Sequence, residues 1–243
     1  MVRAYANVAR RGGTRLAATA GTSLSVSACV LLLTSCVSIP PAPVAPPPDA
    51  GQVALAAGLA SALDVPYRLL FEWSINEPGS RLGGRGVARI EPPAFARLDL
   101  FSSNGERVAA AALNGDSLRV TNDVQMDVPP APLLWGALGV FRPGPAIGLA
   151  GGRRHPGGEL ELQYQDAAGT EFLYMLRDSR IQHIDVQREG RTWEEVALVR
   201  EDGERFPRQA TYRHLEEVRE LRITLESVEH VESYPMDIFD LGL

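Results

Sequence analysis

The chain of 243 residues contains no lysine and only two cysteines, Cys29 and Cys36. All 24 basic side chains are arginines and stand against 30 acidic ones, so the formal net charge is −6. A chain with this excess of acid repels the phosphates of nucleic acids instead of releasing their counterions. The composition therefore excludes nucleic acid as a partner.

The motifs of common catalytic and metal sites are also absent. The sequence has no His-Glu-x-x-His zinc motif, no Gly-x-Ser-x-Gly nucleophile turn and no glycine-rich phosphate loop. Its four histidines, at positions 155, 183, 214 and 230, do not have the spacing of metal ligands. We therefore predict no enzymatic activity, no bound metal and no cofactor.

The N-terminus carries a basic segment followed by an uncharged one. Residues 1–16 hold four arginines and no acid, and residues 17–35 hold no charge and include Val30-Leu31-Leu32-Leu33. This order is typical of a secretory signal, and the apolar run is too short to span a membrane comfortably. The stretch Leu33-Thr34-Ser35-Cys36 resembles the lipobox of bacterial lipoproteins, in which the signal is cut before a lipidated cysteine.

The lipobox resemblance implies that residues 1–35 are removed and that Cys36 anchors the protein to a membrane through lipid. The formal net charge would then change from −6 to −10, because the removed residues hold four arginines and no acid. Cys29 would leave with the signal, so the mature domain would have no free thiol and no disulfide. Val37 in place of an aspartate after the lipidated cysteine implies sorting to the periplasmic face of the outer membrane. Residues 36–48 are rich in proline and should form an extended tether.

Residues 49–243 are expected to form one folded domain. Asp49 is placed to cap a short helix over 50–63, which Pro66 ends. Beyond it, apolar and polar residues alternate with a period of two, the pattern of half-buried antiparallel strands. Ten strands are predicted, at 67–76, 84–91, 95–102, 106–113, 117–121, 158–166, 170–177, 180–188, 192–200 and 218–228, with 206–213 as an eleventh. Turns such as Asn114-Gly115 separate them, so the strands should form a meander that must curl.

The segment 129–157 interrupts the alternation. Residues 133–140 are apolar on every side and follow several prolines, which predicts a short helix that is buried all round. We expect this helix to lie as a plug in the concavity of the curled sheet. Residues 141–158 are rich in glycine and are expected to form a loop without regular structure.

Taken together, these elements resemble the LolA/LolB-like superfamily over roughly residues 50–241. The segments that carry the resemblance are Gly86-Val87-Ala88-Arg89-Ile90, Ala96-Arg97-Leu98-Asp99-Leu100, Gly105-Glu106-Arg107-Val108, the proline-led apolar helix, Leu221-Arg222-Ile223-Thr224-Leu225 and Pro235-Met236-Asp237-Ile238-Phe239. The resemblance implies an α+β, mostly antiparallel fold. That fold is a curled, unclosed half-barrel of 10–11 strands, with short helices covering or plugging its concave face. Members of the superfamily are periplasmic carriers and outer-membrane acceptors of lipoproteins, and a lipid anchor favours the acceptor type.

The resemblance also implies an apolar cavity for acyl chains. The candidate lining residues are Phe71, Trp73, Trp135, Leu138, Phe172 and Tyr174. Small side chains over 108–112 would leave volume for a ligand. Leu82, in a loop over 79–83, and the pair Arg153 and Arg154 are candidates for contact with cargo or a lipid headgroup. The acceptor's projecting apolar loop residue has no counterpart here, because the corresponding turns at 103–106 and 114–116 are polar.

Two functions stay open at this stage. The first is a membrane-anchored lipoprotein that binds acyl chains or lipoproteins, in lipoprotein localisation or lipid transfer at the outer membrane, with a periplasmic carrier protein as a partner. The alternative is a non-catalytic structural, sensor or scaffold lipoprotein whose core is filled and whose acidic surface binds a protein partner.

Overall fold

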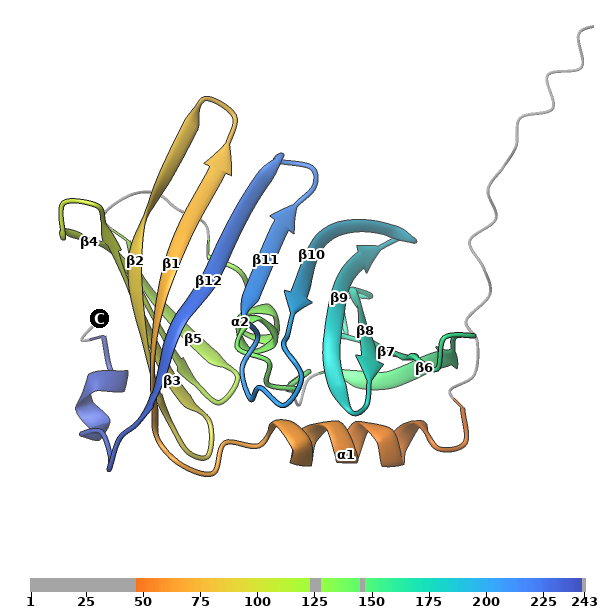
Figure 1. Cartoon of the computed structure of the whole chain (residues 1–243). Coiled ribbons are helices and arrows are strands. Elements are labelled where there is room, and N and C mark those ends of the chain that lie inside the picture. The colour runs from red at the N-terminus through yellow and green to blue at the C-terminus, as the bar shows by residue number, and fades with distance from the viewer. Residues whose placement is uncertain (1–46, 123–127, 145–146, 242–243) are drawn as a thin grey trace, which may run out of the picture. The chain divides into compact units, whose positions relative to one another are not determined.

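A computed structural model of the chain describes residues 47–122, 128–144 and 147–241 (Figure 1). The expected signal peptide, Cys36 and most of the tether lie outside these residues. The described elements are α1 (Ala50–Ser61), β1 (Tyr67–Glu77), β2 (Ser80–Glu91), β3 (Phe95–Ser102), β4 (Arg107–Asn114), β5 (Ser117–Asn122), α2 (Ala131–Ala137), β6 (Gly148–Arg154), β7 (Leu160–Gln165), β8 (Glu171–Arg177), β9 (Arg180–Arg188), β10 (Arg191–Val199), β11 (Gln209–His214), β12 (Arg219–His230) and the 3-10 helix η1 (Met236–Phe239). Neither α-helix in these ranges has the length and apolar character needed to cross a membrane.

The strands form one antiparallel sheet in the order β5-β4-β3-β2-β1-β12-β11-β10-β9-β8-β7-β6. Strands that follow one another in the chain are also neighbours in the sheet, except for β5 and β6, which form its two edges. The sheet curls without closing, because these two edges are not paired with each other (Figure 1). The predicted α+β class and the curled, unclosed half-barrel are therefore confirmed.

The sheet has twelve strands because it contains β6, where the sequence predicted an irregular loop. Residues Gly148 to Arg154 pair with β7, with a register shift between Leu149 and Gly151. The loop prediction for 141–158 was wrong, because glycines have no side chain that could show which face of a strand is buried. The expected loop over 79–83 also differs from the structure, since β2 begins at Ser80 and includes Leu82.

The concave face of the sheet carries the core. Along β1, the side chains of Phe71, Trp73 and Ile75 are buried, whereas Glu72 between them is exposed. Helix α2 lies between the two limbs of the curled sheet, behind β11 in Figure 1, and Trp135 is fully buried in it. The predicted buried plug is therefore confirmed.

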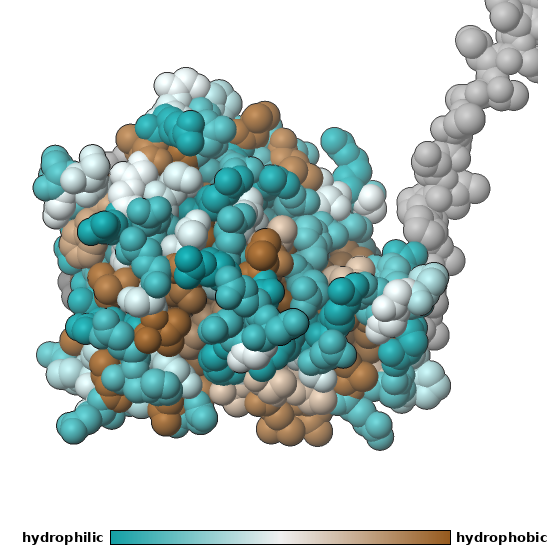
Figure 2. All heavy atoms as spheres, in the orientation of Figure 1, coloured by the Kyte–Doolittle hydropathy of each residue, from teal (hydrophilic) through white to brown (hydrophobic). Residues whose placement is uncertain are grey.

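Helix α1 lies along the lower ends of the strands in Figure 1, beneath β8 and β9. It buries Ala57 and Ser61 and leaves Leu55 and Leu59 exposed, and Figure 2 shows apolar atoms at the surface where α1 lies. Asp49 occupies the N-cap position, but its side chain makes no capping hydrogen bond and instead forms an ion pair with Arg154. The predicted helix is thus correct, while the predicted cap is wrong.

Gly136 of α2 faces β9 so closely that a methyl group would not fit there. A Cβ at Gly136 would lie 2.2 Å from Cδ1 of the fully buried Ile184, whereas nothing lies within 4 Å of a Cβ at Gly58 in α1. We expect Gly136→Ala to lower the free energy of unfolding by about 1–3 kcal/mol through overpacking. The matched Gly58→Ala should raise it by roughly 0.5–1 kcal/mol, because alanine favours the helix. Urea denaturation measures both, and equal changes would contradict the close packing of α2.

Candidate functional site

A narrow apolar slot runs between α2 and the concave face of the sheet. It consists of two cavities of about 40 Å³ and about 20 Å³, and Leu98 and Ile223 line both of them. The first is lined by Leu98, Leu100, Ala109, Ala110, Ala111, Val128, Pro129, Leu134, Leu221 and Ile223, and the second by Leu69, Phe71, Leu98, Ala137, Leu138, Phe206, Pro207, Ala210, Ile223 and Leu225. A cavity that holds one water molecule needs roughly 10–15 Å³ of such space, so the slot has room for a few water molecules at most.

Small side chains of β4 leave the space of the first cavity. Ala109 and Ala111 lie directly opposite Leu100 and Leu98 of β3, so all four side chains point to the concave face. A larger residue at either alanine would fill the slot. The run of small side chains predicted to leave volume for a ligand therefore lies where a change in side-chain size alters the volume of the slot.

Three of the six predicted cavity residues lie at α2 or beside it. Phe71 and Leu138 line the second cavity, and Trp135 is buried within α2. The indole Nε1 of Trp135 donates a hydrogen bond of 2.7 Å to the carbonyl oxygen of Gly115, so its polar atom is satisfied. This bond also ties α2 to the turn between β4 and β5.

The other three predicted cavity residues do not line the slot. The indole Nε1 of Trp73 donates to the carbonyl oxygens of Arg85 and Phe101, at 3.1 and 3.0 Å. Phe172 and Tyr174 lie on β8, and the ring of Tyr174 contacts those of Phe141 and Tyr164. Burial raises the pKa of the Tyr174 hydroxyl far above its ordinary value, and this hydroxyl has no hydrogen-bond partner among the described residues.

One end of the slot lies next to the guanidinium of Arg200, which the sequence analysis did not single out. A methyl group on Gly139 would lie 2.7 Å from Arg200 Nη2 and 2.9 Å from Cδ of Pro207, which lines the second cavity. Arg200 Nη1 donates to the backbone carbonyl of Arg205, while Nε and Nη2 are buried without a partner among the described residues. Desolvation, together with the nearby charges of Arg180 and Arg205, lowers the pKa of Arg200 to about 10.

The C-terminal end of α1 closes this end of the half-barrel. Arg205 donates to the carbonyl oxygens of Ala60, Ser61 and Ala62 at 2.9, 2.8 and 2.7 Å, which satisfies the last turn of the helix. The hydroxyl of Ser61 accepts a hydrogen bond of 2.9 Å from the backbone N–H of Phe141. Helix α1 is thereby fixed to the segment that follows α2.

The residues predicted to contact cargo or a headgroup lie away from the slot. Leu82 is 43% exposed within β2. Arg153 and Arg154 lie on the edge strand β6, and Arg153 forms an ion pair of 3.1 Å with Glu161. No lining residue of the slot is among them.

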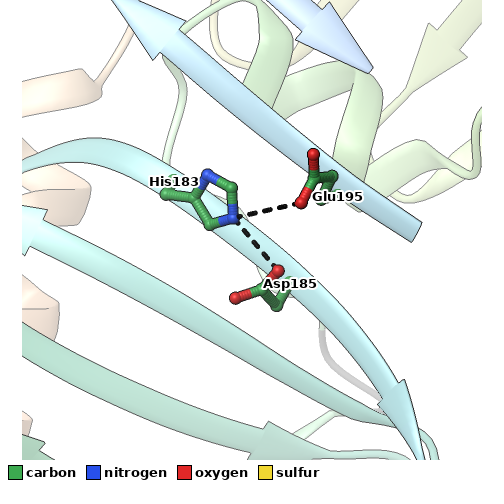
Figure 3. Close-up of side chains that lie close together, drawn as sticks. All are labelled: His183, Asp185 and Glu195. Atoms are coloured by element: carbon green, nitrogen blue, oxygen red, sulfur yellow. Dashed lines mark hydrogen bonds and ion pairs between the residues drawn. The ribbon is translucent and has the colours of Figure 1, made fainter. Parts of the chain in front are cut away.

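Figure 3 shows a polar group that the sequence did not predict, made by His183 and Asp185 on β9 and Glu195 on β10. His183 Nε2 lies 3.0 Å from Asp185 Oδ1 and 3.9 Å from Glu195 Oε2. One ligand atom from each residue lies within 4.8 Å of the others, which is close enough to hold a metal ion. Glu195 is also paired with Arg213 at 2.9 Å, so ion pairs already satisfy the group. Sequence spacing could not reveal it, because Glu195 comes from the neighbouring strand.

Comparisons with known proteins support the fold and no more. No protein-family model matches the sequence, and no curated protein matches it. The LolA superfamily protein NE2245 from Nitrosomonas europaea aligns with 78% of this chain and 96% of its own, with a TM-score of 0.52 and 10% identity. A putative outer membrane lipoprotein-sorting protein domain from Vibrio parahaemolyticus aligns with 78% of this chain and 95% of its own, with a TM-score of 0.46 and 7% identity. The first likeness confirms the predicted LolA/LolB-like fold.

Removing the Ser61 hydroxyl should destabilise the junction between α1 and α2. In Ser61→Ala the buried N–H of Phe141 loses its acceptor, which should lower the free energy of unfolding by about 1–3 kcal/mol. Ser74→Ala, on the half-buried side of β1, removes the same atom and should change it by less than about 0.5 kcal/mol. Urea denaturation compares the two variants, and a negligible effect of Ser61→Ala would show that the junction does not depend on this bond.

The stability contributed by His183 should depend on pH. The hydrogen bond from His183 to Asp185 raises the pKa of the imidazole in the folded chain. Its contribution is therefore fully present below the unfolded pKa of about 6.5 and is lost as pH rises through the higher folded pKa. We expect His183→Gln to destabilise the protein more at pH 5.5 than at pH 8.5 in urea denaturation. An equal loss at the two pH values would contradict an ion pair at this position.

Proposed function

We propose that this chain is a non-catalytic lipoprotein, anchored to a membrane, whose half-barrel binds the acyl chains of lipids or lipoproteins beneath α2. The observation that carries the proposal is the slot. Its two cavities adjoin each other, and the side chains that line them are all apolar. Apolar lining with small side chains on β4 suits a flexible hydrocarbon chain and offers no groups for chemical catalysis.

Acyl-chain binding requires α2 to move away from the sheet, because cavities of about 40 and about 20 Å³ cannot hold a chain. The helix packs against β9, β10 and β11 mainly through apolar side chains. An acyl chain gains about 0.8 kcal/mol for each buried CH₂ group, so ten methylenes would contribute roughly 8 kcal/mol. This gain could offset the contacts that α2 gives up.

The lipid anchor is proposed at Cys36, with residues 36–48 as the tether and the periplasmic face of the outer membrane as the location. The support is the lipobox-like sequence in front of Cys36 and the residue Val37 that follows it. Fold similarity to a LolA superfamily protein agrees with a place in lipoprotein localisation or lipid transfer. A periplasmic carrier protein would then be the partner that delivers the cargo.

The alternative function is a structural, sensor or scaffold lipoprotein with a filled core. The small volume of the slot favours it, because a packed interior needs no ligand. An acidic surface that includes the exposed Glu216 and Glu217 would then meet a protein partner.

The two functions differ in what the purified domain contains. Residues 49–243 would be secreted into a bacterial periplasm, purified without detergent and extracted with organic solvent for mass spectrometry. We expect a stoichiometric fatty acid or phospholipid. Ala109→Leu should fill the slot and reduce the bound lipid severalfold, whereas Ala56→Leu adds the same volume on the exposed side of α1 and should leave it unchanged. A stable domain free of lipid would contradict acyl binding and favour the scaffold.

A further inference from the structure

A second pocket lies on the outer face of the sheet, over β2, β3 and β4 and beside η1, which Figure 1 shows next to these strands near the C-terminus. Its volume is about 600 Å³, and it is open to solvent. It is lined by Arg89, Arg97, Asp99, Phe101, Arg107 and Ile238. Three of these side chains are basic and one is acidic, in a chain whose net charge is −6.

Asp99 accepts hydrogen bonds from two of the three guanidinium groups and lies near the third. Its carboxylate accepts from Arg97 Nε and Nη2, each at 3.0 Å, and from Arg89 Nη1 at 2.7 Å. Arg107 Nη1 lies 3.8 Å from the same carboxylate. Asp99 itself is only 3% exposed, so the group that orients the arginines is buried and fixed.

Two positive charges remain after Asp99 has neutralised one. Arg89 and Arg97 are direct cross-strand neighbours on β2 and β3, an arrangement of like charges whose repulsion the single carboxylate of Asp99 offsets only in part. Arg89 uses only Nη1, and Arg107 makes no hydrogen bond within the described part of the chain. Their side chains are 32% and 48% exposed, so the unused donors can reach a ligand in the pocket.

We propose that this pocket binds a phosphate group, with Arg89 and Arg107 as its donors and with Arg97 and Asp99 as the frame that orients them. Guanidinium groups present paired N–H donors that match phosphate oxygens, and a charge-assisted bond of this kind is stronger than a neutral one. Phe101 adds an apolar wall, so the chemistry fits the phosphate of a lipid headgroup as well as a free phosphate ion. The site does not depend on acyl binding, because the slot lies on the concave face.

The test uses the full chain in dodecyl maltoside micelles, which contain no phosphate. Thermal unfolding is followed while inorganic phosphate or dihexanoyl phosphatidylglycerol is added. The reference for inorganic phosphate is sodium chloride at equal ionic strength, and the reference for phosphatidylglycerol is dihexanoylglycerol. We expect a phosphate probe to raise the Tm of the parent chain. Arg107→Gln should weaken the apparent affinity by roughly tenfold or more, because a charge-assisted hydrogen bond is lost. Arg208→Gln removes an equally charged, exposed side chain outside the pocket and should respond like the parent.

Arg89→Gln removes the second donor and should show the same loss, so the result does not depend on the folding of one variant. If only inorganic phosphate raises the Tm, the ligand of the pocket is a free phosphate ion. If phosphatidylglycerol raises the Tm more strongly, the ligand is the phosphate of a lipid headgroup. The proposal is overturned if neither phosphate probe acts beyond its reference. It is also overturned if both pocket variants respond like Arg208→Gln.

Discussion

The pairing of β1 with β12, near the middle of the sheet, is the constraint on which the rest of the structure depends. It joins the first and last strands of the chain, from Tyr67 opposite His230 to Asn76 opposite Glu220, and makes one sheet out of two meanders. As a result, β5 and β6 become the outer edges, although they follow each other in the chain. Helix α2 comes between β5 and β6 in the chain, and its buried side chains belong to the core on the concave face.

Much of the fold could be predicted from the sequence, because the strands have one wet and one buried side. The alternation in β1 identified its inward face, and the all-round apolar character of 133–140 identified a buried helix. Strand β6 was not predicted, because its glycines have no side chains whose polarity could show which face of the strand is buried. The candidate site was predicted less well, since alternation shows that Trp73 and Tyr174 are buried but not what they contact. The slot is defined by strand order, which brings Leu98, Leu138 and Ile223 together from distant parts of the chain.

The two faces of the sheet satisfy different physical requirements. Among the described residues, the concave face buries apolar side chains around α2 and leaves two small cavities, one of them beside the alanines of β4. The outer face carries charges, which are arranged in groups such as the one around His183 and the one around Asp99. Because every basic side chain except histidine is an arginine, one carboxylate can be shared by several planar guanidinium groups. The small apolar cavities therefore lie on the concave face, and the open pocket lined by arginines lies on the outer face.

The pairing of β1 with β12 also constrains the order in which the polypeptide assembles. Hairpins within β1–β5 and within β6–β12 join strands that are close in sequence, whereas β1 meets β12 only across almost the whole domain. Closing so long a loop costs more conformational entropy than closing a hairpin, and it must wait until the last strand has been made. Until Arg219–His230 is available, the β1 meander has an unpaired edge that another chain could join. The pairing of β1 with β12 is thus the last one to form. A chain shortened before β12 would have two separate sets of hairpins instead of one sheet.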